Sequence, residues 1–72
     1  MSSENIVNLI KVGLRMRFDK SSFNFLVEKD LITIEASKIS ANSAIELEEY
    51  VQKMRQSNIV LDNKVQIKLV LL

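Results

Sequence analysis

Apolar and polar residues alternate through much of the first half of the chain, and this period of two restricts the fold more than any other feature. Every second residue from position 10 to position 18 is apolar: Ile10, Val12, Leu14, Met16 and Phe18. Successive side chains of a strand point to opposite faces of a sheet, so the pattern predicts a first strand with one buried face. Residues 23–28 and 31–36, which carry apolar residues at every second position, predict two more strands.

The loop lengths predict how these strands pair. A four-residue loop after position 18 sets Phe18 opposite Phe23, and a two-residue loop after position 28 sets Phe25 opposite Ile34. Both registers place apolar side chains on one face of the sheet, whereas a slip of one residue would turn a strand's apolar set to water. The sequence therefore predicts an antiparallel meander of three strands, with Phe25 in its central strand.

The spacing of apolar residues becomes helical after residue 42. The apolar positions now recur every three or four residues: Ala44, Leu47, Tyr50, Val51 and Met54. This stripe predicts one helix, packed on the apolar face of the meander. Ser43 followed three residues later by Glu46 fits a capping box at the start of the helix.

The tail returns to strand character. Apolar residues alternate from Val65 onward, and residues 69–72 are apolar on both faces. Residues 59–61 form either a short extra strand or the exit of the helix. The last strand joins an edge of the sheet, and the edge at residues 10–18 is favoured over the alternative beside residues 31–36. The fold class is thus α+β in the order β-β-β-α-β, as one domain over residues 1–72, with residues 1–5 frayed.

The composition lacks several residue types on which enzyme chemistry depends. His and Cys are absent, so the chain has no imidazole base, thiolate nucleophile, thiolate–imidazole zinc site or disulfide. The one glycine, Gly13, sits inside a strand pattern, where it indicates a bulge or a close approach instead of a phosphate loop. We expect a binding protein and not an enzyme, with no cofactor and no metal.

The expected location is the cytoplasm, with no membrane contact. The N-terminus lacks the basic region and cleavage pattern of a signal peptide. No apolar run approaches the roughly 20 residues of a membrane-spanning helix.

A basic row is the strongest polar signal. Lys11, Arg15 and Arg17 point the same way from the predicted first strand, and Lys20 lies in the turn that follows. Such a row can follow phosphates or an acidic partner. The phenylalanines that would stack on bases fall on the opposite side, however, and the formal net charge is only +1. The alternative interpretation is a charged face that protects an edge strand.

An apolar surplus is the second signal. One helix covers one face of a sheet, which leaves several leucines without a partner, and no charged residue or proline follows Lys68 in the last strand. Exposed apolar clusters mark interaction surfaces, and monomers usually blunt such an edge. We therefore expect a small adaptor, inhibitor or regulatory subunit that forms a homodimer or binds a protein partner, with nucleic-acid binding as the alternative function. The expected interface residues are Leu26, Leu31, Val65, Ile67, Leu69, Val70, Leu71 and Leu72.

Overall fold

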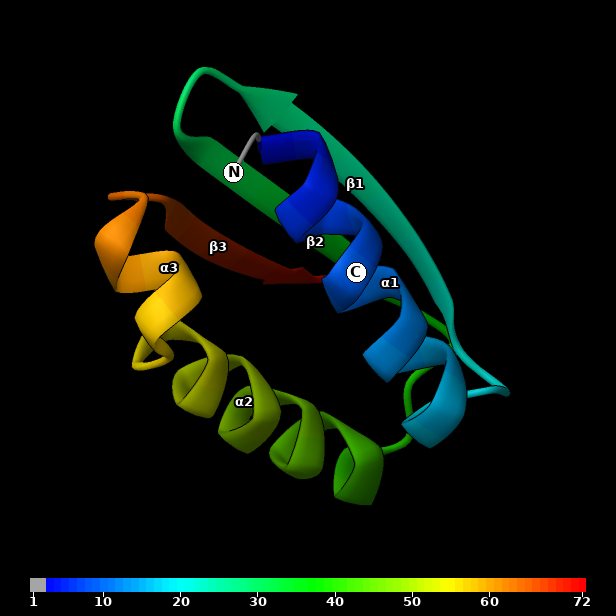
Figure 1. The fold of residues 1–72 in the computed structure, drawn as a ribbon. Helices are drawn as coiled ribbons and strands as arrows, with labels where there is room; N and C mark the ends of the chain where they lie inside the picture. Colours follow the sequence, from blue (N-terminus) through cyan, green and yellow to red (C-terminus); the bar gives the residue numbers. More distant parts are fainter. Residues whose placement is uncertain (1–2) are drawn as a thin grey trace.

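Residues 3–72 are described by a computed structural model, in which helices cover a three-stranded mixed sheet (Figure 1). The elements follow in the order α1 (Ser3–Arg17), β1 (Ser22–Glu28), β2 (Leu31–Ser37), α2 (Ala41–Arg55), α3 (Asn58–Asp62) and β3 (Gln66–Leu71). A small α+β fold is confirmed, but it begins with a helix where a strand was expected. Residues 3–5, which were expected to fray, belong to α1, and residues 1 and 2 lie outside the described part.

The predicted strand over residues 10–18 is wrong, because residues 3–17 form helix α1. The buried side chains of α1 follow helical spacing: Ile6, Val7, Ile10 and Leu14. Val12 and Met16, which the alternation placed inside, are 57% and 81% exposed. Phe18 follows the helix and does not pair with Phe23 as a strand neighbour, although their rings meet edge to face with centroids 6.3 Å apart.

The second predicted pairing is confirmed. Strands β1 and β2 are antiparallel, with Phe25 opposite Ile34 and Val27 opposite Ile32. The connection is the two-residue turn expected from the sequence, and Lys29 within it has a φ of 54°. Glycine and asparagine adopt this left-handed conformation more readily than lysine, so the register is maintained by the apolar pattern and not by favourable turn chemistry.

Strand β3 pairs with β2 in parallel, which gives the strand order β1-β2-β3. The favoured edge at residues 10–18 was therefore wrong, since those residues form no strand, and the alternative beside residues 31–36 is correct. The sheet is mixed and not an antiparallel meander. Its central strand is β2, so Phe25 lies in an edge strand and is only half-buried. A parallel neighbour needs a crossover connection, which α2 and α3 provide.

The core lies between the helices and one face of the sheet. Ile32 and Ile34 of β2 are fully buried, and they pack in one cluster with Leu14 of α1 and with Leu47 and Val51 of α2. Because alternate residues of β2 point to this side, both long helices lie on the same face of the sheet. The opposite face carries no helix in the described chain.

The start of α2 differs from the predicted capping box. The N-cap is Ser40, whose Oγ accepts a hydrogen bond from the Ser43 N–H at 3.2 Å. Ser43 itself lies in the first turn, so the helix begins before the predicted pair Ser43 and Glu46. Residues 59–61 lie in α3, which excludes the extra strand and favours the helical exit.

Gly13 lies where α1 passes close to α2. A Cβ atom built on Gly13 would overlap the Tyr50 hydroxyl and lie 3.1 Å from the ring carbon Cζ. The expected bulge is wrong, because Gly13 is helical, but the expected close approach is present and involves an aromatic side chain. Tyr50 in turn packs edge to face on Phe18, with ring centroids 6.3 Å apart.

Candidate interaction edge at strand β3

Strand β3 lies at the edge of the sheet, and half of its backbone groups point away from β2. The Gln66 N–H donates to the Asp30 carbonyl at 2.7 Å, and the Leu72 N–H donates to the Ala36 carbonyl at 2.8 Å. Even-numbered residues therefore face β2. Since successive amides of a strand point to opposite edges, the N–H and C=O groups of residues 67, 69 and 71 face outward. No strand within residues 3–72 pairs with this side of β3.

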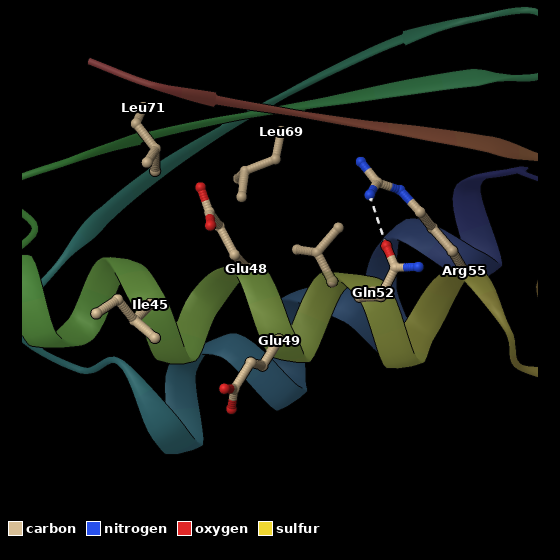
Figure 2. A pocket seen from close by; sticks show the side chains of 8 residues that line it. Ile45, Glu48, Glu49, Gln52, Arg55, Leu69 and Leu71 are labelled. Carbon is tan, nitrogen blue, oxygen red and sulfur yellow. Dashed lines mark hydrogen bonds between the residues drawn. The ribbon is translucent and has the colours of Figure 1, made fainter.

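An arginine from α2 covers one end of this outward edge. The Arg55 Nε donates to the Ile67 carbonyl at 3.0 Å, which confirms that this carbonyl points away from β2. The same guanidinium donates from Nη1 to Gln52 Oε1 at 3.1 Å, so it is held from two sides (Figure 2). The outward N–H and C=O groups of Leu69 and Leu71 lie beyond the arginine along β3.

A groove of about 730 Å³ runs between α2 and this edge. Leu69 and Leu71 project from β3 toward α2, and the Glu48 carboxylate points from α2 toward them (Figure 2). Ile45 on the helix is 60% exposed and Leu71 is 44% exposed. The floor is thus apolar while the helix wall is mixed. The lining residues are Ile45, Glu48, Glu49, Val51, Gln52, Arg55, Leu69 and Leu71.

The interface residues expected from the sequence fall into three environments. Val65 and Ile67 are buried in the core, so only their backbone could reach a partner. Leu69 and Leu71 line the groove. The remaining four lie outside the groove: Leu26 and Leu31 on the open face of β1 and β2, Val70 on the open face of β3, and Leu72 just beyond β3.

Sequence reasoning missed the residues that α2 contributes. In the sequence, Arg55 looks only like a cation in the last turn of a helix, where such residues are favourable. Its hydrogen bond to β3 depends on where that strand lies in the sheet, which the sequence left open. Ile45 carried a usable signal, because it is a large apolar residue outside the helical stripe of buried positions.

The four basic residues do not form one row, because Lys11, Arg15 and Arg17 lie on helix α1 and Lys20 lies in the turn after it. Lys11 and Arg15 are one turn apart and lie beside β1, where the Lys11 Nζ is 5.3 Å from the centroid of the Phe25 ring. Arg17 lies near α2, with its Cζ 5.2 Å from the centroid of the Tyr50 ring. Lys20 is exposed in the turn that follows α1. The structure brings Lys11 and Arg15 together and separates Arg17 from them.

The described residues 3–72 form neither a cluster of side chains for a metal ion nor a membrane-spanning helix. Within residues 3–72, no three side chains of His, Cys, Asp or Glu gather where they could hold a metal ion. No helix of this part of the chain is long and apolar enough to span a bilayer.

Comparisons with known proteins give no relative on which to base a function. No protein family model, curated protein or solved structure matches the chain.

Proposed function

We propose that this protein is a non-enzymatic interaction module that associates with a second copy of itself by strand addition at β3. The observation that carries the proposal is the outward edge of β3, where the backbone groups of Leu69 and Leu71 face away from the sheet. An extended partner strand at such an edge gains main-chain hydrogen bonds, and a neighbouring groove accepts its side chains.

The position of the groove supports the same proposal. Leu69 and Leu71 are at once the residues with outward amides and the apolar floor of the groove. A strand added at this edge would therefore form hydrogen bonds and cover leucine side chains in one step. Small domains gain stability from burial of this kind, since their own cores are limited in size.

A proline substitution separates strand addition from other ways of associating. Leu71→Pro removes an outward N–H and leaves the hydrogen bonds between β3 and β2 in place, because the Leu71 N–H does not face β2. Leu71→Ala is the matched control, because it removes the same side chain and keeps the N–H. Sedimentation equilibrium over a concentration series is expected to show a dimer for the unmodified chain and a weaker dimer for Leu71→Ala, which loses the apolar contact of the side chain. We expect Leu71→Pro to bind itself at least about tenfold more weakly than Leu71→Ala, because it loses one hydrogen bond per subunit and thus two per dimer.

A second control tests whether the open face of the sheet is used instead. Leu26→Lys places a charge on that face in β1, two strands away from the β3 edge. We expect its self-association to equal that of the unmodified chain. The proposal fails if the unmodified chain is monomeric at high micromolar concentration, or if Leu26→Lys and not Leu71→Pro abolishes the dimer. Circular dichroism checks that each variant keeps its fold.

Fewer observations support nucleic-acid binding through the basic row. Only Lys11 and Arg15 share one side of α1, and the Lys11 ammonium already lies over an aromatic ring. A titration of the unmodified chain against nucleic acid at low and high salt tests this alternative, because phosphate contacts lose affinity steeply as salt rises.

A further inference from the structure

The position of Arg55 limits which part of β3 a second copy can reach. Its guanidinium occupies the outward side of the Ile67 carbonyl at 3.0 Å and is held there by Gln52. A partner strand that needed this carbonyl would have to compete for it with the guanidinium, which already occupies its outward side. Beyond it, Leu69 and Leu71 offer four outward groups, one N–H and one C=O each.

We infer that the two copies pair as antiparallel β3 strands about a two-fold axis at Val70, an inference that rests on the proposed self-association. In this register Leu69 lies opposite Leu71 of the partner subunit, and the two residues exchange both of their hydrogen bonds. On the other side of the axis, Leu71 and Leu69 of the partner subunit form the same two hydrogen bonds. The four outward groups of Leu69 and Leu71 are then satisfied in each copy, and the Ile67 carbonyl stays with Arg55.

A neighbouring register would be centred on Leu69. It would pair Leu69 with Leu69 of the partner subunit and would require Ile67 to bond with Leu71 of the partner subunit. The Ile67 carbonyl is the group that Arg55 covers. The arginine therefore acts as a positioning residue that favours the Val70 register over this one.

The side chains agree with the Val70 register. On the helix side, the row of Leu69 and Leu71 continues into the same two leucines of the second copy. This row lies beside α2 in each copy, where Ile45 is exposed at the side of the groove. On the open face, Val70 meets Val70 of the partner subunit, and pairs of β-branched side chains pack well across strands.

The other edge of the sheet is a poorer partner for β3. The Lys11 ammonium lies over Phe25 of β1, and a cation beside an edge strand opposes strand addition. Pairing of β3 with β1 of another copy would also join unlike surfaces and produce open-ended chains. A closed dimer is expected only from pairing of β3 with itself.

Single-cysteine variants measure the register directly, because the chain has no cysteine of its own. In the Val70 register the two Cα atoms at position 70 form a non-hydrogen-bonded pair about 4.5 Å apart, within the range that a disulfide spans. The two Cα atoms at position 69 are then diagonal neighbours about 7–8 Å apart, which is too far. Under a mild oxidant, Val70→Cys is expected to form the linked dimer at least about tenfold faster than Leu69→Cys, because only its thiols meet the geometry that a disulfide requires.

The arginine is tested in the same experiment. Arg55→Ala frees the Ile67 carbonyl, so the Leu69 register becomes accessible, and crosslinking of Leu69→Cys is expected to rise in this background. If Arg55 only stabilised the fold, its removal would not change which of positions 69 and 70 crosslinks faster. Unchanged crosslinking at both positions would overturn the assigned role of Arg55.

The outcomes separate this inference from the proposed function. A dimer that crosslinks faster at position 69 than at position 70 refutes the register and keeps strand addition. A dimer that crosslinks at neither position refutes the register, and the response to Leu71→Pro then decides whether strand addition holds. A monomer in sedimentation refutes the proposed function itself, and growth into higher oligomers shows pairing between unlike edges and overturns the two-fold arrangement.

Discussion

Replacement of Gly13 by alanine tests the packing of α1 against α2, the part of the fold that the alternating pattern concealed. In a helix interior alanine is more favourable than glycine by about 0.8–1.0 kcal/mol, so helix propensity alone predicts a gain in stability. The structure predicts the opposite sign. The new methyl group would occupy the place of the Tyr50 hydroxyl and lie 3.1 Å from the ring carbon Cζ.

The magnitude follows from what must move. Tyr50 is half-buried and its ring packs on Phe18, so the ring cannot turn away without loss of that contact. Overpacking costs about 1–3 kcal/mol, and an aromatic pair contributes about 0.5–1.5 kcal/mol. After the gain in helix propensity is subtracted, Gly13→Ala is expected to lower the free energy of unfolding by about 0.5–3.5 kcal/mol. For a chain of this size each kcal/mol corresponds to a fall in Tm of about 4–8 °C.

The assay is urea denaturation at one fixed protein concentration, since dissociation of a dimer would otherwise contribute to the measured stability. Tyr50→Phe supplies the matched background, because it removes the hydroxyl that lies closest and keeps the ring. We expect Gly13→Ala to be at least about 1 kcal/mol less harmful in this background. A stabilisation of about 1 kcal/mol by Gly13→Ala in both backgrounds would refute the close packing of α1 on Tyr50.

Five further substitutions test particular elements. Phe25→Ala is expected to cost about 1–2 kcal/mol, because Phe25 is half-buried in an edge strand, whereas Ile34→Ala in the central strand costs about 2–5 kcal/mol; equal losses in urea denaturation would contradict the strand order. Ser40→Ala is expected to cost about 1 kcal/mol as the loss of the α2 cap, and Ser43→Ala less than about 0.5 kcal/mol; the reverse order would restore the capping box predicted from the sequence. Lys64→Gly is expected to raise the free energy of unfolding by up to about 1 kcal/mol, because Lys64 has a φ of 55°, a conformation that glycine adopts without steric cost. A loss of stability in urea denaturation would contradict this explanation.

The hairpin was predictable because its determinants are local. The two-residue loop and the apolar faces of residues 23–28 and 31–36 specify the same register, and a slip of one residue would expose Ile32 and Ile34. No information from distant parts of the chain was needed.

Helix α1 was missed because two periods coincide in its sequence. Positions 10, 14 and 18 satisfy both an alternation of two and a helical spacing of four. Ile6 and Val7 extend only the helical pattern, since both are buried and adjacent residues of a strand cannot share one face. Attention to the residues before position 10 would have favoured the helix.

The candidate site was predictable only in part. The apolar tail marked Leu69 and Leu71, but which amides face outward depends on the pairing of β3 with β2, a contact between distant segments. The sequence left two positions open for this strand. The role of Arg55 follows from the same contact, so no local pattern could reveal it.

Amide hydrogen exchange at β3, resolved by residue with NMR at several protein concentrations, tests strand addition most directly. The Lys68 and Val70 amides face β2 and should be protected at every concentration, so they serve as internal references. The Leu69 and Leu71 amides face outward, and their protection is expected to rise with protein concentration as the second copy binds. Fast exchange of both amides that does not change with concentration, in a sample shown to be folded by protection at the two reference positions, would contradict the account.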